Sequence, residues 1–185
     1  QLEAIPHTKL GQHASLLIVI GGDGSMLQAA RFATPQDLPV LGINKGRLGF
    51  LADINPGDTQ SIIDVLAGAY VKEKRTLMTT TLINQKTGAQ KKIGLALKEV
   101  LFARSTTIEL QTFDSFINQR FVCRQHADGL IISTPSGSTA YALSSGGPIL
   151  HPGLKAFCLV PMCPHTLNSR PLIIDDRSEI ELIPY

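Results

Sequence analysis

The first third of the chain alternates between short apolar runs and segments with helical spacing. Residues 16–20 form a continuous, mostly β-branched apolar run, which is typical of a parallel strand covered on both faces. Apolar residues recur at helical spacing over 25–33, and a second apolar run covers 40–43. This order predicts a βαβ unit. A further amphipathic helix is predicted over 62–70.

The character of the sequence changes after Arg75, where threonine and β-branched residues dominate. We therefore predict two domains: a Rossmann-like α/β domain with a parallel sheet over 1–75, and a β-rich domain over 76–185. Both are expected to be incomplete, because the chain starts at Gln1 shortly before a strand and stops just after another. The predicted strands of the second domain cover 77–83, 93–97, 108–113, 116–122, 130–133, 157–160 and 180–183.

Composition narrows the possible functions. The 185 residues are 43% hydrophobic, yet no apolar run approaches the roughly 20 residues that a membrane-spanning helix needs. A formal net charge of +2 with 5% aromatic residues gives little support for nucleic-acid binding. The three cysteines show no Cys-x-x-Cys spacing, which argues against a disulfide framework and a zinc site. A soluble protein of the reducing cytoplasm is the class that fits, with no membrane or nucleic-acid partner.

The first candidate site is the glycine-rich turn Gly21-Gly22-Asp23-Gly24-Ser25 between the first strand and the first helix. Glycines let the backbone approach phosphate oxygens closely, and the start of a helix offers unpaired N–H groups, so Gly21, Gly22, Gly24 and Ser25 are predicted to bind phosphate. A carboxylate there would accept a proton from a hydroxyl or help to hold a metal ion. The alternative is that Asp23 only caps the helix and the glycines only turn the chain.

The second candidate site is a hydroxyl-rich stretch, Ser133 to Tyr141, which follows Asp128-Gly129 and a short strand. Hydroxyls and exposed amides near a helix start suit hydrogen bonding to a sugar or a phosphate, and an aromatic ring can pack against another ring. The alternative is an ordinary Ser/Thr-rich loop that caps a helix.

The sequence resembles the bacterial NAD kinase family over about residues 16–174. The diglycine-aspartate turn by itself is weak evidence, because phosphofructokinases and lipid kinases share it. The combination with later segments in the same order is specific. The segments that carry the resemblance are Gly21-Gly22-Asp23-Gly24, residues 41–51, Asp128-Gly129, residues 133–141 and residues 161–167.

The resemblance implies a kinase that transfers the γ-phosphoryl of ATP, or of polyphosphate, to the 2′-hydroxyl of the adenosine ribose of NAD. It also implies a homodimer or homotetramer, with the active site between the two domains. Mg²⁺ would arrive with the nucleotide, so no dedicated set of metal ligands is expected. Two alternatives stay open: a lipid or sugar kinase with the same glycine turn, and a dinucleotide sensor without catalysis.

The resemblance also assigns roles to individual residues. Asp23 would be the general base, with Gly24 beside it, and Phe50 would pack near the adenine. Asp128 and Glu99 would hold polar groups of the dinucleotide. Further substrate contacts are expected from Ser136, Thr139, Ala140, Tyr141, Ala142, Leu143 and Ser144.

Two positions depart from the family pattern. Lys98 stands where the family usually has an asparagine that contacts the dinucleotide, and His126 stands where many NAD-preferring members have a basic residue. If Lys98 is part of a strand, it points to the opposite face from Glu99, which makes Asp128 its expected partner. The preference between NAD and NADH is left open by His126.

Overall fold

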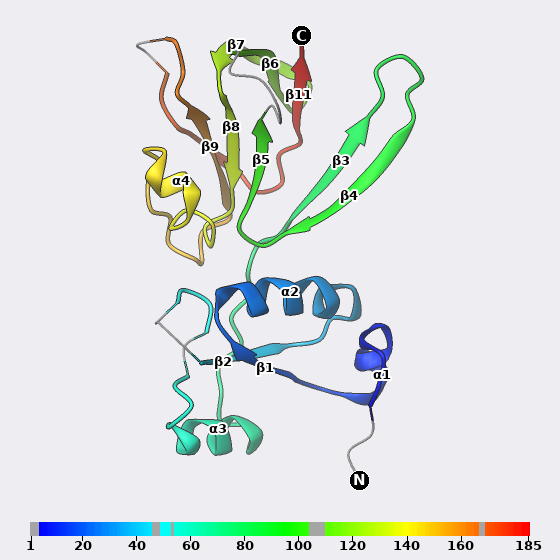
Figure 1. Cartoon of the computed structure of the whole chain (residues 1–185), viewed down its shortest axis with the longest axis vertical. Coiled ribbons are helices and arrows are strands. Elements are labelled where there is room, and N and C mark those ends of the chain that lie inside the picture. The colour runs from blue at the N-terminus through cyan, green and yellow to red at the C-terminus, as the bar shows by residue number, and fades with distance from the viewer. Residues whose placement is uncertain (1–3, 46–48, 53, 104–109, 167–168) are drawn as a thin grey trace. The chain divides into compact units, whose positions relative to one another are not determined.

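The computed structural model describes residues 4–45, 49–52, 54–103, 110–166 and 169–185. The chain divides into two compact units, Gln1–Glu73 and Lys74–Tyr185, so the division falls two residues from the predicted one. Figure 1 shows the elements of each unit. None of the described helices is long and apolar enough to span a membrane.

The first unit is built around a parallel pair of strands. Strand β1 (Leu17–Gly21) pairs with β2 (Val40–Asn44), with Leu17 opposite Val40, and helix α2 (Asp23–Ala33) connects them. This is the predicted βαβ arrangement (Figure 1). The other elements are η1 (His7–Lys9), α1 (Leu10–His13), η2 (Thr34–Gln36) and α3 (Thr59–Leu66).

Two details of the first unit differ from the sequence-based expectation. Strand β1 is not covered on both faces, because Ile18 is 38% and Ile20 is 65% exposed while their neighbours are partly buried. Helix α3 begins and ends earlier than predicted. The Asp58 carboxylate accepts the Ser61 N–H at 3.1 Å and fixes the helix start, and Gly68 follows its end with a φ of 91°.

The second unit is β-rich, as predicted, and its strands form three antiparallel sheets. One sheet has the order β10-β9-β8-β5, a second has the order β11-β6-β7, and β3 pairs with β4 in a separate hairpin (Figure 1). The strands are β3 (Met78–Ile83), β4 (Gln90–Ala96), β5 (Glu99–Ala103), β6 (Gln111–Ile117), β7 (Arg120–Ala127), β8 (Gly129–Ser133), β9 (Ala156–Met162), β10 (Leu172–Asp175) and β11 (Ile180–Pro184), and helix α4 covers Tyr141–Ser144.

Several strand predictions for this unit were wrong in detail. The expected break near residue 114 does not exist, because β6 continues to Ile117 and the turn lies at Asn118 and Gln119. Both turn residues have positive φ, 49° and 65°, as a two-residue hairpin turn of the primed type requires. Strands β5 and β10 were not predicted. The beginning of the predicted strand over 108–113 lies outside the described residues.

Apolar side chains cover both faces of β8. Leu130 and Ile132 belong to one core cluster together with Phe113 of the other sheet, whereas Ile131 belongs to a second cluster with Ala142 and Val160. Burial on both faces explains why residues 130–132 are continuously apolar. Strand β8 is therefore packed on both sides between the residues at its two ends.

Candidate functional site

The turn between β1 and α2 is capped by the backbone alone. The Gly22 carbonyl accepts the N–H groups of Ser25 at 3.0 Å and Met26 at 3.2 Å, and no side chain caps the helix. Asp23 is the first helical residue rather than its cap. The capping alternative therefore does not describe what this carboxylate does.

Two main-chain amides hold the Asp23 carboxylate from a segment 27 residues further along the chain. Its Oδ1 accepts the N–H of Leu51 at 3.0 Å and that of Phe50 at 3.1 Å, and Oδ2 lies 3.3 Å from the Phe50 nitrogen. A Cβ on Gly49 would collide with Oδ1, so the close approach depends on a glycine there. Backbone amides bind an ionised carboxylate well and fix its orientation.

The backbone around Asp23 leaves room for a ligand. A Cβ built on Gly22 or on Gly24 would meet nothing within 4 Å. Gly21 differs, because its Cβ would collide with the Ser25 Oγ, which folds back over it. The open backbone at the start of α2 can thus take an anion, as the glycines predict. Phe50 is 63% exposed, so its ring is accessible.

A second group of predicted residues meets in the second unit. Glu99 is the first residue of β5, and its carboxylate accepts the backbone N–H of Tyr141. Burial raises the pKa of Glu99, and the charge of Lys98 and the Tyr141 amide act in the opposite direction. The Glu99 Oε2 is buried and has no hydrogen-bond partner among the described residues. A buried acceptor without a partner is costly and is suited to a ligand hydroxyl or amide.

The position of Lys98 corrects one expectation. It precedes β5 at a bend instead of lying on the strand, so strand alternation does not separate it from Glu99. Its positive charge lowers the pKa of Glu99. Lys98 therefore belongs to the Glu99 end of the unit.

Most hydroxyls of the hydroxyl-rich stretch bind the chain itself. Thr134 Oγ1 donates to the carbonyls of Leu97 at 2.6 Å and Lys98 at 3.0 Å, and Ser138 Oγ donates to the Pro135 carbonyl at 2.7 Å. Ser133, Thr134, Ser136 and Ser138 are all buried. Thr134 and Ser138 therefore use their hydroxyls to build the loop, as the alternative of a capping Ser/Thr-rich loop describes.

The remaining predicted residues of this stretch differ in exposure. Ser136 and Ala142 are buried as whole residues. Thr139 and Ala140 are partly buried, and Tyr141, Leu143 and Ser144 are exposed. The accessible part of the stretch is therefore its end, around α4.

His126 and Asp128 lie at the other end of β8. Strand β8 places Ser133 opposite Glu99 and starts at Gly129, directly after Asp128. At about 3.4 Å per residue, the two groups are separated by roughly 14 Å or more. The Asp128 N–H donates to the Met162 carbonyl at 3.0 Å, and the His165 N–H donates to the His126 carbonyl at 2.9 Å.

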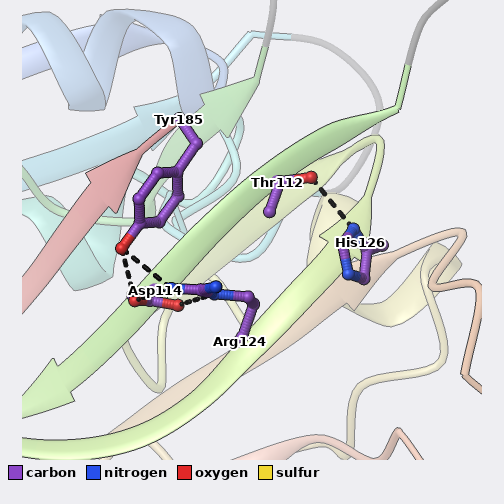
Figure 2. A network of polar contacts seen from close by, with 5 residues as sticks. All are labelled: Thr112, Asp114, Arg124, His126 and Tyr185. Carbon is purple, nitrogen blue, oxygen red and sulfur yellow. Dashed lines mark hydrogen bonds and ion pairs between the residues drawn. The ribbon is translucent and has the colours of Figure 1, made fainter.

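Figure 2 shows the surroundings of His126 on the sheet of β6, β7 and β11. Its Nδ1 lies 2.9 Å from the Thr112 hydroxyl. Two register pairs further along, Arg124 forms two hydrogen bonds with Asp114, at 2.7 and 2.9 Å, and the Tyr185 hydroxyl donates to the same carboxylate at 2.7 Å. Arg124 also lies over the Tyr185 ring, 4.6 Å from its centroid.

Comparison with known families identifies the family to which the chain belongs. The sequence profile of the ATP-NAD kinase N-terminal domain matches residues 5–70, and that of the ATP-NAD kinase C-terminal domain matches residues 97–184. The chain belongs to the NAD kinase family. This result favours the first prediction over the lipid- or sugar-kinase alternative.

Curated relatives and solved structures agree with this assignment. The NAD kinase of Coxiella burnetii (strain RSA 493 / Nine Mile phase I) is 53% identical over 183 residues, which are 98% of this chain and 60% of that protein. That of Legionella pneumophila (strain Paris) is 50% identical over 179 residues, 96% of this chain and 60% of that protein. The chain thus spans about 60% of the length of these relatives.

Two solved structures share the fold over nearly the whole chain. The yeast NADH kinase, solved in complex with NADH, has a TM-score of 0.88 at 31% identity and is matched over 96% of this chain and 52% of that chain. An NAD kinase from Archaeoglobus fulgidus, solved in complex with ATP, has a TM-score of 0.80 at 26% identity, covering 100% of this chain and 70% of that chain. The predicted fold class, an α/β domain followed by a β-rich domain, is confirmed.

Sequence reasoning missed the residues that hold Asp23. The amides of Phe50 and Leu51 and the glycine at 49 lie in a turn whose glycines were visible, but no local pattern links that turn to residue 23. The predicted topology could have indicated them. Because β1 and β2 are parallel neighbours, the residues that follow β2 lie at the same edge of the sheet as the residues that follow β1.

Proposed function

We propose that the protein transfers the γ-phosphoryl group of ATP to the 2′-hydroxyl of the adenosine ribose of NAD and so makes NADP. The observation that carries this proposal is the Asp23 carboxylate, held by two amides beside an open glycine backbone at a helix start. A phosphoryl transfer needs positioning, charge stabilisation and one proton acceptor rather than covalent chemistry by the protein.

In this proposal Asp23 accepts the proton of the ribose hydroxyl. Its Oδ1 accepts the N–H groups of Leu51 at 3.0 Å and Phe50 at 3.1 Å, and we assign the proton transfer to Oδ2, which lies farther from the Phe50 nitrogen, at 3.3 Å. As the hydroxyl oxygen forms its bond to the γ-phosphorus, the bond from that phosphorus to the bridging oxygen breaks and ADP leaves. The open backbone at Gly22 and Gly24 supports binding of the phosphate oxygens during this step.

The residues fit a divalent cation that arrives with the nucleotide. Among the described residues there is no group of three or more His, Cys, Asp or Glu side chains that could form a metal site. Mg²⁺ is commonly held by phosphates and only one or two carboxylates, and Asp23 is a hard oxygen donor at the phosphate end. When bound, Mg²⁺ would neutralise charge on the phosphates.

In the second unit, Glu99 and Tyr141 are the groups that we propose to contact the dinucleotide. The buried Oε2 of Glu99 offers an acceptor to a ribose hydroxyl or a carboxamide, and the exposed Tyr141 ring offers a surface for stacking. The NADH and ATP complexes of the two related structures support NAD and ATP as substrates. Polyphosphate stays a second possible donor, which the assay below includes.

We also propose that the protein works as a homo-oligomer in the cytoplasm. The four-stranded sheet ends in β10 and β5, and the open edges of such strands favour pairing with a second copy. Three free cysteines, Cys123, Cys158 and Cys163, support a reducing compartment. Light scattering at micromolar concentration should give more than one chain per particle, and a fully active monomer would contradict this part.

The experiment that tests the activity is direct. Purified protein is incubated with Mg-ATP and NAD, and NADP is measured with an NADP-specific dehydrogenase. Parallel reactions replace ATP with polyphosphate and NAD with NADH. Formation of NADP or NADPH that requires a phosphoryl donor supports the proposal. A folded protein that makes neither product with either donor contradicts it.

A further inference from the structure

The cysteine that follows β9 lies beside the Asp128 carboxylate. Gly129 pairs with Met162 in the antiparallel register of β8 and β9, so Cys163 is the next residue opposite Asp128. The pairing continues past the strand end, because the Asp128 N–H donates to the Met162 carbonyl at 3.0 Å. Opposite residues in an antiparallel pair have Cβ atoms about 4.5–5.5 Å apart on the same face of the sheet. The register therefore brings a thiol next to a carboxylate.

The Cys163 thiol donates a hydrogen bond to the Asp128 carboxylate. That bond is the main reason why the pKa of Cys163 is raised, and the negative charge of Asp128 adds to it. The thiol therefore stays protonated and remains a donor at neutral pH. The Cys163 backbone is left-handed, with a φ of 44°, a conformation that a residue other than glycine keeps only where its surroundings hold it. The chain is thus fixed where the thiol reaches the carboxylate.

A ligand can reach this pair from solvent. Asp128 and Cys163 are both exposed. A carboxylate has about four acceptor positions on its two oxygens, and the single thiol hydrogen can take only one of them. An exposed side chain that rotates freely loses rotamer freedom when it binds a ligand, whereas a side chain that is already held loses less. The thiol therefore prepares the Asp128 carboxylate to accept a hydroxyl or an N–H group.

We propose that Cys163 is a positioning residue that holds the Asp128 carboxylate in place for the dinucleotide. The proposal rests on the proposed function and on the role that the family resemblance implies for Asp128, and it adds a residue to which the resemblance gives no role. Cys163 acts through Asp128 and takes no part in the proton transfer at Asp23. Its effect should therefore appear in the affinity for NAD and not in kcat.

Three variants test the proposal through the affinity for NAD, measured by calorimetry on the full chain. Cys163→Ala should raise the Kd for NAD about fivefold, because the carboxylate loses a hydrogen bond that fixes it. Cys163→Ser keeps a donor and should stay within about twofold of the wild type. Cys123→Ala removes a thiol from β7 as the matched control and should leave the Kd unchanged. In all three variants kcat at saturating substrates should equal that of the wild type. An unchanged Kd in Cys163→Ala, no recovery with serine, or an equal loss in the control would overturn the proposal.

A second measurement separates this proposal from the proposed reaction, because it needs no catalysis. Iodoacetamide alkylates Cys163 at pH 8, and mass spectrometry of the labelled peptide gives the rate. Asp128→Asn should raise this rate at least about twofold, because it removes the charge that keeps the thiol protonated. His126 and His165, the neighbouring ionisable groups, are the same in both proteins. Saturating NAD should slow the alkylation of Cys163 and not that of Cys123.

The outcomes of the two measurements are distinguishable. A wild type that makes no NADP but shows both changes in alkylation would contradict the proposed reaction and support the positioning role. An unchanged rate in either comparison would show that Cys163 does not hold Asp128 or that NAD does not bind there, and the inference would be wrong.

Discussion

Replacing Asp23 by asparagine separates the two tasks that the structure gives this residue. The side chain keeps its size, and its amide oxygen can still accept the N–H groups of Leu51 and Phe50 that Oδ1 accepts at 3.0 and 3.1 Å. What it loses is the negative charge and the ability to take a proton. Asp23→Asn should therefore fold and bind nucleotide but not catalyse the transfer at a useful rate.

The expected magnitudes of the two effects are far apart. Two charge-assisted hydrogen bonds become neutral ones, at a cost of about 1 kcal/mol each, so the free energy of unfolding should fall by about 2 kcal/mol at most. This is a fraction of the roughly 5 to 15 kcal/mol that folded domains have. Loss of a general base should lower kcat by about 10²-fold or more.

The assay measures NADP formation with saturating Mg-ATP and NAD, together with urea unfolding of the same samples. Asp58→Asn is the matched control. Its carboxylate also accepts a backbone N–H, from Ser61 at 3.1 Å, and asparagine is an equally good helix cap. This control should retain full activity. If Asp23→Asn keeps more than about a tenth of the wild-type rate, Asp23 is not the base and the mechanism is wrong.

Three further outcomes can be checked separately. Pairing with Arg124 lowers the pKa of Asp114 from 3.8 to about 2, so its contribution to stability is complete above pH 3.8 and lost as the pH falls towards 2. Asp114→Asn should remove this part of the acid sensitivity in urea titrations, and unchanged acid sensitivity would contradict it. Thr134→Val should lower the free energy of unfolding by about 1–3 kcal/mol, because the buried Gly137 N–H, 3.2 Å from Oγ1, and the Leu97 carbonyl lose a partner. A loss below about 0.5 kcal/mol in urea unfolding would count against this reading. Lys98→Asn should lower the Kd for NAD at least about fivefold in calorimetry with little change for ATP, since an amide replaces a donor-only charge near the proposed site; equal NAD affinities would show that Lys98 points away from it.

Local pattern was enough to predict the elements that are regular and buried. The apolar runs at 16–20 and 40–43 predicted β1 and β2, and the glycine turn between them predicted the start of α2 within two residues. The continuous apolar run at 130–133 predicted β8, since burial on both faces removes any polar alternation. Strand β5 was not predicted, because Lys98 and Glu99 were interpreted as binding residues and not as the start of a strand.

Long-range contacts were not predictable from local pattern. Nothing near residue 23 indicates that the amides of Phe50 and Leu51 will hold its carboxylate. The same is true of the separation between Glu99 and Asp128, which depends on the register of β5 with β8. Residue type therefore identified the chemistry of the site, and pairing between distant segments determined which of those residues lie together.

The hydroxyl-rich stretch positions Glu99 by binding the backbone that leads into it. Thr134 binds the carbonyls of Leu97 and Lys98, and a Cβ at Gly137 would collide with the Lys98 carbonyl, so the loop packs directly against the chain that leads into Glu99. At the end of the same stretch, the Tyr141 N–H donates to the Glu99 carboxylate. The loop packs closely against the backbone of Leu97 and Lys98 and also places the Tyr141 amide at Glu99. Such close packing has room only for small side chains, and their buried hydroxyls must find hydrogen-bond partners within the loop. That requirement explains the density of serine, threonine and glycine without giving each hydroxyl a ligand, and it explains why the exposed, chemically available residues are gathered at the end of the stretch.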